Sequence, residues 1–458
     1  MTVLFITNVG NRDVQVPNHQ DLPTKARPLG EFLLANWDQY ADQIELPILG
    51  KALRWVAQTH GQVDQVVLVV SDQDDERFRP SDTIVVAEVI KRILQENDSW
   101  QTYAASTNIQ IVTIPGNPSD YDLMMGFYKD LMQPFEITSN DSVYLAVSGG
   151  TPAMASMLLL RGIEVFGKKA HPLYVNQVYT MPMTLDVGRR LVLDAALNHI
   201  RQTLVVFQYD AAQTIFDSHQ DMLRNALPGF DSFKALLDHA RQRYNFNFQE
   251  AQRALLGADR NLPKILAQRI FVLADDIAQR DTCWLLREEI FATELDFRNK
   301  AYKDAVSNVF AFREGLLRQL AIQHGTQLID NRQFAPDWLE QDPDLVKYLK
   351  SKNIDTSRTV TTFVFERVLG FKAKQDADLQ MFMKDIDVFT LLAKVRNEAT
   401  HNHEGVSEQL IAEKFEGGPE AVLEHMHHLY KVLTGDSPGP NAFDTINDLL
   451  FLLLDEAS

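Results

Sequence analysis

The sequence predicts an α/β domain followed by an all-α region, and three observations support this fold class. Short β-branched or apolar runs alternate with segments of helical spacing in the first part of the chain. From about residue 195 onward, helical periodicity replaces the strand pattern. The length of 458 residues exceeds what one hydrophobic core normally organises, so two or three domains are expected.

Five predicted strands define the N-terminal domain. They are the runs at 3–7, 66–70, 109–114, 143–147 and 172–175. Segments 83–94 and 153–166, which have helical spacing, lie between them. Alternating strands and helices of this kind predict a parallel, doubly wound, Rossmann-like sheet.

Helical segments dominate the rest of the chain. Segment 235–244 is predicted helical, and 302–322 is a strongly amphipathic helix candidate. The dipeptide Pro228-Gly229, the residue Gly257 and the tripeptide Gly417-Gly418-Pro419 predict turns between helices. The last apolar run, 449–454, is too short to cross a bilayer and instead predicts the buried stripe of a final helix.

Composition and charge restrict the possible functions. A net charge of −18 opposes nucleic-acid binding over a broad surface, so stable DNA binding is not expected and any contact with RNA is local. Cys283 is the only cysteine, which excludes an intramolecular disulfide framework and a cysteine-rich zinc site. The N-terminus reads as a first strand rather than a signal peptide, and we expect a cytoplasmic protein without a membrane anchor.

A glycine turn follows the predicted strand 143–147. Its residues are Ser148, Gly149, Gly150 and Thr151, followed by Pro152. Two glycines allow a ligand close to the backbone, and a helix that begins at Pro152 would direct N–H groups toward an anion. A tight turn without a ligand is the structural alternative. The turn matches neither the dinucleotide nor the Walker-type glycine pattern.

Two further polar loops should meet this turn at the same sheet edge. Segment 7–13, which contains Asn8 and Gly10, follows the first strand, and segment 71–75 follows the second. The second loop continues into an acidic cluster that disfavours an anion, so it is not assigned to the binding site. The cluster comprises Asp72, Asp74, Asp75 and Glu76.

Arg396, Asn397 and His401 form the candidate catalytic group near the C-terminus. A guanidinium beside an imidazole supplies a permanent cation and a proton-transfer group, which suits phosphodiester cleavage without a metal. Asn397 would orient either partner. A solvated helix end is the alternative, because similarly spaced pairs recur by chance at Arg12/His19, Arg54/His60 and Arg318/His324.

The order of these features along the whole chain resembles that of the CARF-HEPN ribonucleases of type III CRISPR systems, in the Csm/Csx ancillary group. The resemblance implies a CARF ligand-sensing domain at 1–190, a helical linker domain at 191–300 and a HEPN ribonuclease domain at 301–458. It also implies a homodimer that cuts single-stranded RNA when a cyclic oligoadenylate binds.

The resemblance also implies roles for individual residues. Ser148, Gly149, Gly150 and Thr151 would hold the activator, and Asn8 and Gly10 would face it from the first loop. Arg396 and His401 would form the nuclease site, with Asn397 in support. No metal or other cofactor is expected, and the activator is expected to be cyclic tetra-adenylate, with hexa-adenylate as the other candidate.

Two other functions remain open at the level of sequence. A metal hydrolase would use the late histidines and Glu404, but no His-Glu-x-x-His spacing is present. A non-enzymatic cyclic-nucleotide sensor is the second alternative, although no basic recognition helix is visible. RNA cleavage in EDTA discriminates among the three.

Overall fold

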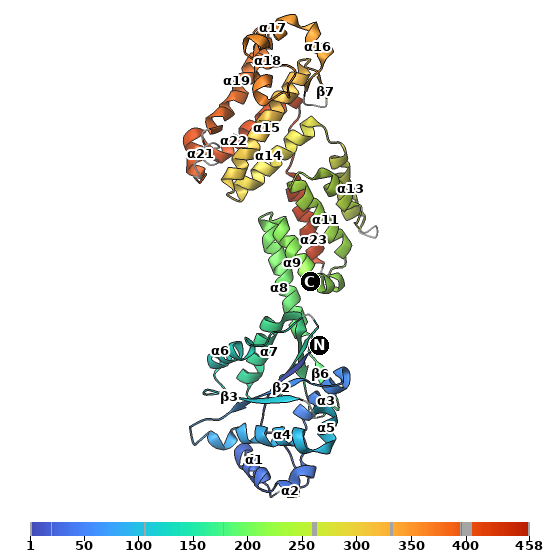
Figure 1. Ribbon diagram of the computed structural model, residues 1–458, viewed down its shortest axis with the longest axis vertical. Coiled ribbons are helices and arrows are strands. Elements are labelled where there is room, and N and C mark those ends of the chain that lie inside the picture. Colours follow the sequence, from blue (N-terminus) through green and yellow to red (C-terminus); the bar gives the residue numbers. More distant parts are fainter. Residues whose placement is uncertain are drawn as a thin grey trace. The chain divides into compact units, whose positions relative to one another are not determined.

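The computed structural model describes residues 2–19, 21–104, 107–138, 140–176, 178–258, 263–329, 333–393, 395 and 405–456. The chain divides into two compact units, Met1–Ala195 and Ala196–Ser458 (Figure 1). The first unit is α/β and the second is almost entirely helical, which confirms the predicted fold class. The predicted division of the helical part at residue 300 stays a prediction.

A six-stranded sheet with the order β3-β2-β1-β4-β5-β6 organises the first unit. The strands are β1 (Val3–Asn8), β2 (Gln65–Ser71), β3 (Asn108–Ile114), β4 (Ser142–Ala146), β5 (Ala170–Tyr174) and β6 (Met183–Thr184). The first five strands pair in parallel, as predicted, and the short β6 pairs antiparallel with β5. The strand β6 was not predicted, because its two exposed residues carry no periodic signal.

Helices cover both faces of this sheet (Figure 1). Successive residues of β1 point to opposite faces. Val3 and Phe5 join the core beneath α1, α3 and α4, whereas Leu4 and Ile6 join the core beneath α6 and α7. The helices are α1 (Ala26–Ala35), α2 (Trp37–Tyr40), α3 (Leu49–His60), α4 (Ile84–Glu96), α5 (Asp98–Ala104), α6 (Tyr121–Met132) and α7 (Pro152–Phe166), with short 3₁₀ turns at Ala41–Gln43, Arg79–Ser81 and Gly167–Lys169.

The strand order creates a switch point beside β1. From β1 the chain proceeds outward through β2 to β3 and then returns to place β4 on the other side of β1. The loops that leave the carboxyl ends of β1 and β4 therefore run in opposite directions. Open α/β sheets bind ligands in the crevice that this divergence produces.

The second unit contains the remaining helices. They are α8 (Val187–Val205), which includes the boundary between the units, α9 (Tyr209–Ser218), α10 (Gln220–Ala226), α11 (Phe230–Tyr244), α12 (Phe248–Leu255), α13 (Lys264–Ala278), α14 (Thr282–Arg298), α15 (Tyr302–Gln323), α16 (Pro336–Gln341), α17 (Pro343–Ser351), α18 (Thr362–Lys372), α19 (Ala377–Asp387), η4 (Val388–Leu392), α21 (Glu408–Lys414), α22 (Gly418–Thr434) and α23 (Ala442–Asp455). A small hairpin joins β7 (Leu328–Ile329) to β8 (Gln333–Phe334). Segment 302–322 is helical, as predicted.

The final helix α23 packs on α11, far from it in sequence (Figure 1). Leu449, Leu450 and Leu453 are buried, which confirms the predicted apolar stripe. Asn447 fixes the position of the helix, because its Nδ2 donates to the Leu204 carbonyl at 2.6 Å and its Oδ1 accepts from the Tyr209 hydroxyl at 3.1 Å. Among the described residues, no helix has both the length and the apolar character needed to span a bilayer.

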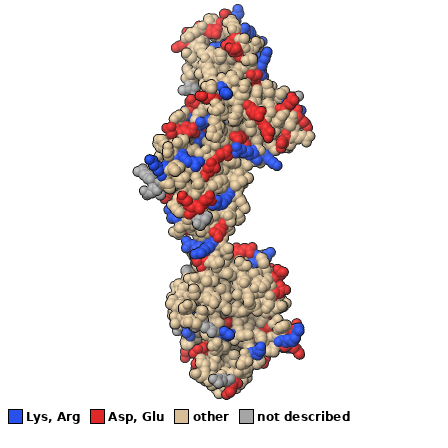
Figure 2. Space-filling model, turned by 180° about the vertical axis from the view of Figure 1, so that it is seen from behind, with Lys and Arg blue, Asp and Glu red and all other residues tan. Residues whose placement is uncertain are grey.

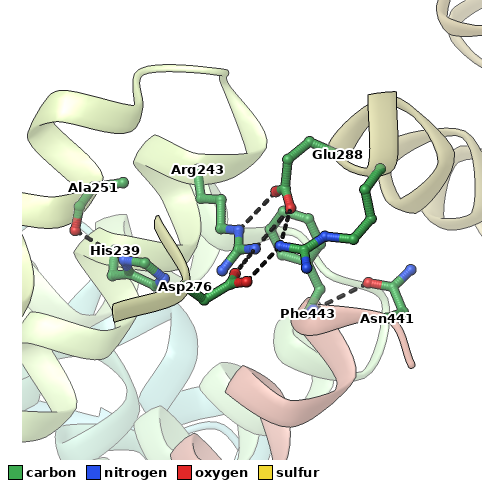
Figure 3. Close-up of polar contacts among 8 residues, drawn as sticks. His239, Arg243, Ala251, Asp276, Glu288, Asn441 and Phe443 are labelled. Atoms are coloured by element: carbon green, nitrogen blue, oxygen red, sulfur yellow. Dashed lines mark hydrogen bonds and ion pairs between the residues drawn. The ribbon is translucent and has the colours of Figure 1, made fainter. Parts of the chain in front are cut away.

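A buried ionic cluster joins α11, α13 and α14 (Figure 3). The Arg243 side chain is fully buried and donates to both carboxylate oxygens of Glu288 at 2.7 Å, and to Asp276 at 2.8 Å. Burial alone would raise the pKa of Asp276, but Arg243 and Arg287 hold it below its ordinary value. Beside the cluster, burial lowers the pKa of His239 to about 4, so the ring is neutral.

We predict that Arg243→Met lowers the free energy of unfolding by roughly 3–5 kcal/mol, because Glu288 then keeps a buried charge without its partner. Arg241→Met is the matched control on the same helix. Arg241 pairs with Asp238 where both side chains are about one third exposed, so its loss should cost less than about 1 kcal/mol. Urea unfolding of the two variants measures the difference, and equal losses would contradict the assignment.

Candidate functional site

A cavity of about 610 Å³ opens at the carboxyl edge of the sheet. Its walls come from the loops that follow the first four strands, namely residues 9–13, residues 71 and 73, residues 117–119, and residues 148–151. The expected convergence of the polar loops with the glycine turn is therefore present. The cavity lies at the switch point between β1 and β4, where the topology favours ligand binding.

Glycine is required where the first loop meets the turn after β4. A Cβ on Gly149 would lie 2.1 Å from the carbonyl oxygen of Asn8, and a Cβ on Gly10 would lie 3.1 Å from the nitrogen of Gly150. Gly150 has a φ of +77°, which residues with a side chain rarely adopt. The two loops can approach this closely only because no side chain separates their backbones.

Asn8 lies beneath this turn rather than on the cavity wall. Its side chain is completely buried, and its Oδ1 accepts a hydrogen bond from the Tyr128 hydroxyl. Burial raises the pKa of Tyr128 far above its ordinary value, so the phenol stays protonated and acts as the donor. The sequence placed Asn8 opposite the ligand, whereas the structure places it where it can support the turn.

The two hydroxyl groups of the turn already have partners within the protein. The Thr151 hydroxyl donates to the Pro118 carbonyl and accepts from the backbone N–H of Met154 at 3.2 Å, which caps α7. Its only hydrogen is therefore not directed at a ligand. The Ser148 hydroxyl oxygen accepts from the Val175 N–H, which leaves its own hydrogen available to donate.

Asp13 is a wall residue that was not among the sequence candidates. Its carboxylate is buried and accepts from the N–H of Gly10 at 2.6 Å and from the N–H of Leu49 at 3.2 Å. Burial raises the pKa of Asp13 to about 6, although these hydrogen bonds oppose the rise. A loop aspartate is ordinarily exposed, so only the tertiary structure identifies this residue as the one that fixes the first loop.

Arg12 supplies a cation at the mouth of the cavity. It lines the wall, its side chain is exposed, and it has no ion-pair partner among the described residues. In the sequence Arg12 stood out only as half of a chance pair with His19. That histidine instead contacts Gln43, at 2.9 Å.

Two of the four acidic residues in the loop after β2, Asp72 and Asp75, have ion-pair partners. Arg27 pairs with Asp72 and lies 3.8 Å from the buried Asp82, and Arg77 pairs with Asp75 at 2.6 Å. Asp82 also accepts from the backbone N–H and the side-chain amide of Gln73, at 2.7 and 3.0 Å. The expected conflict between acidic residues and an anion is therefore reduced by internal pairing.

The candidate catalytic residues Arg396, Asn397 and His401 lie outside the described residues. On either side of the motif, η4 ends at Leu392 and α21 begins at Glu408. In the chance pair Arg54/His60 the two side chains contact different residues, since Arg54 lies over the Trp100 ring at 4.2 Å while His60 is hydrogen bonded to Tyr144 at 2.6 Å.

The described residues offer no set of metal ligands that would support the metal-hydrolase alternative. Among the described ranges, no three His, Cys, Asp or Glu side chains are grouped to hold a metal ion. His425 is occupied by a 2.8 Å contact with the Asp385 carbonyl. His401, His403 and Glu404 fall outside the described ranges.

The architecture is that of an α/β unit joined to a helical unit, and comparisons with known proteins show what it resembles. Residues 276–451 match the family model of the Cas_Csm6 HEPN domain. Over 100% of both chains, the fold is similar to that of Enterococcus italicus Csm6 bound to cyclic hexa-2'-fluoro-hexa-dAMP, with a TM-score of 0.61 and 14% sequence identity. A comparison with curated proteins finds no significant match. The helical unit thus matches the Csm6 HEPN family model over residues 276–451, and the predicted resemblance to type III CRISPR CARF-HEPN ribonucleases is confirmed.

The raised pKa of Asp13 predicts a specific pH dependence. Between about pH 4 and pH 6 the folded state binds a proton that the unfolded state has released, so the free energy of unfolding falls as pH rises through this window. Asp13→Asn lacks this contribution. From low to neutral pH, the free energy of unfolding of the wild type should therefore fall by about 3 kcal/mol relative to that of Asp13→Asn.

Urea unfolding at a series of pH values, followed by amide hydrogen exchange in β1 and β4, measures this difference. Asp120→Asn serves as the control, because Asp120 is an exposed cap of α6. A constant difference between wild type and Asp13→Asn would show that the carboxyl group is not desolvated.

Proposed function

We propose that the chain is a cyclic oligoadenylate-activated endoribonuclease of type III CRISPR antiviral defence, which cuts single-stranded RNA in the cytoplasm without a metal. One observation carries this proposal: Arg396 and His401 fall inside the segment 276–451 that matches the Csm6 HEPN family. The cavity at the switch point of the first unit supplies a place for the activator.

The chemistry of the cavity fits an oligonucleotide ring. Backbone N–H groups around Gly149 and Gly150, the Ser148 hydroxyl and the Arg12 guanidinium can receive phosphate and ribose oxygens. Gly10 lets the first loop approach the ligand, while Asn8 and Thr151 hold the turn in place. The similar Enterococcus italicus protein was solved with a cyclic hexa-adenylate analogue, which supports this ligand class. Tetra-adenylate and hexa-adenylate are both candidates.

Cleavage would follow from the pairing of Arg396 with His401. The ribose 2′-hydroxyl attacks the adjacent phosphorus, and the bond from phosphorus to the 5′-oxygen breaks. His401 transfers the proton needed at an attacking or leaving oxygen, Arg396 stabilises the charge on the phosphate, and Asn397 orients them. The products are a 2′,3′-cyclic phosphate and a 5′-hydroxyl end.

A homodimer would complete the nuclease site. Five helical positions rotate by about 140°, so Arg396 and His401 of one copy diverge unless the helix ends between them. A two-fold axis beside the motif would place two copies of each residue in one cleft. The same symmetry would let two cavities share one symmetric ring.

The distribution of charge agrees with a local RNA site. On the face shown in Figure 2, acidic and basic side chains are interspersed. A protein with this surface and a net charge of −18 would engage a few nucleotides rather than a long duplex.

We predict that His401→Ala reduces RNA cleavage by roughly 10²–10⁴-fold, the usual contribution of general acid-base catalysis. His324→Ala is the matched control in the same unit, because His324 is partly exposed and lies 3.8 Å from Asp376, outside the motif. The assay follows a fluorescent RNA in EDTA with saturating activator.

Equal rates for His401→Ala and wild type would remove the catalytic assignment. Efficient cutting of an RNA with 2′-deoxy sugars would overturn 2′-hydroxyl attack. Strict dependence on an added metal would revive the hydrolase alternative, and activator binding without any cleavage would favour the non-enzymatic sensor.

A second prediction concerns the activator site. Gly149→Ala should weaken binding of cyclic oligoadenylate roughly tenfold or more, because the new Cβ forces the turn away from Asn8. Gly126→Ala in α6 is the control, since a Cβ there meets no atom within 4 Å. Calorimetric titration with the tetra- and hexa-adenylate rings compares the two. Unchanged affinity in folded Gly149→Ala would exclude the turn from the sensor site.

A further inference from the structure

A second hollow lies in the helical unit, lined by segments that precede and follow the proposed catalytic motif in sequence. Its volume is about 660 Å³, and η4, the start of α22 and the residues that precede it form its walls. The side chains that matter for its chemistry are Leu391, Phe415, Glu416, Glu424, His425 and His428. We refer to it as the α22 hollow.

One wall of the α22 hollow is rigid and aromatic. The His425 Nε2 donates to the Asp385 carbonyl at 2.8 Å, which fixes the ring. The same ring meets Phe389 edge-on at 5.1 Å and lies nearly parallel to His428, with ring centres 6.2 Å apart. His428 is exposed, so one face of this imidazole is available for a flat ligand.

The rim of the hollow carries two carboxylates. Glu416 and Glu424 are exposed, and neither has an ion-pair or hydrogen-bond partner among the described residues. Two unpaired negative charges repel phosphate, so the RNA backbone does not fit here. They instead accept N–H donors. A flat group that carries N–H donors and no negative charge therefore suits this hollow.

Guanine meets these requirements better than the other RNA bases. Its N1–H and N2–H groups are parallel and match the two oxygens of one carboxylate. Adenine, cytosine and uracil do not have two neighbouring nitrogen atoms that both donate along this edge. Single-stranded RNA bases are commonly stacked on aromatic or histidine rings and read along this edge. The His428 face and the Glu424 carboxylate provide these two elements.

The hollow is also close enough to the proposed cutting residues. Leu391 precedes Arg396 by five positions, so their Cα atoms are at most about 18 Å apart whatever path the chain takes. A short single strand can therefore occupy the hollow while a nearby phosphate reaches Arg396.

We infer that the α22 hollow binds a guanine of the RNA substrate and thereby selects the phosphodiester bond that is cut. Glu424 accepts the two N–H groups and His428 stacks on the base. This inference rests on the proposed ribonuclease function and adds the residues that determine its sequence preference.

The test compares short RNAs that differ at one base, with saturating activator. Wild type should cut the guanine-containing RNA with a higher kcat/KM than its adenine, cytosine and uracil counterparts. Glu424→Gln should reduce cleavage of the guanine RNA by roughly 10- to 100-fold, because the amide presents a donor to a donor, and should leave the other RNAs unaffected. Glu420→Gln removes the same charge from the same helix outside the hollow and should keep the preference.

The possible failures are distinguishable. Cleavage of every RNA at equal rates overturns the inference while the proposed function stands. A guanine preference that survives in both Glu424→Gln and His428→Ala also overturns it. Absence of any RNA cleavage removes the proposed function together with the inference. Thermal unfolding of each variant confirms that it is folded.

Discussion

The close approach of Gly149 to the Asn8 carbonyl oxygen is the constraint on which the first unit depends. β1 and β4 are neighbours in the sheet, and their loops leave in opposite directions at the switch point. Because Gly149 has no side chain, the turn can pack directly against the end of β1. Tyr128 from below and Asp13 from the side then hold the same loop. The shape of the cavity is therefore determined mainly by how these two backbone segments pack.

The helical unit depends on a different kind of constraint, the burial of charge. Arg243 is tolerated in the interior only because Glu288 and Asp276 receive its hydrogen bonds. Glu288 belongs to α14, which also packs along α15 in the core that contains the HEPN family match. The helix α14 therefore contacts both α11 and the core of the proposed nuclease region. An activator can influence such a unit only through different affinities for two of its states.

Much of the fold was accessible from the sequence, and the limits have physical causes. The five parallel strands and helices such as α7 and α15 carry strong local periodicity, and the glycine turn carries its own backbone signal. The burial of Asp13, the support of Asn8 by Tyr128 and the pairing of Arg27 with Asp72 all join residues distant in sequence. No local pattern encodes such contacts. Arg396, Asn397 and His401 remain predictions from the motif and the family.

The most direct measurement is the initial rate at which the wild-type chain cuts a fluorescent single-stranded RNA in EDTA, titrated with cyclic tri-, tetra- and hexa-adenylate. We predict a low rate without activator and a saturable increase with the tetra- or hexa-adenylate ring. A rate that no ring changes would contradict the coupling between the cavity and the HEPN region.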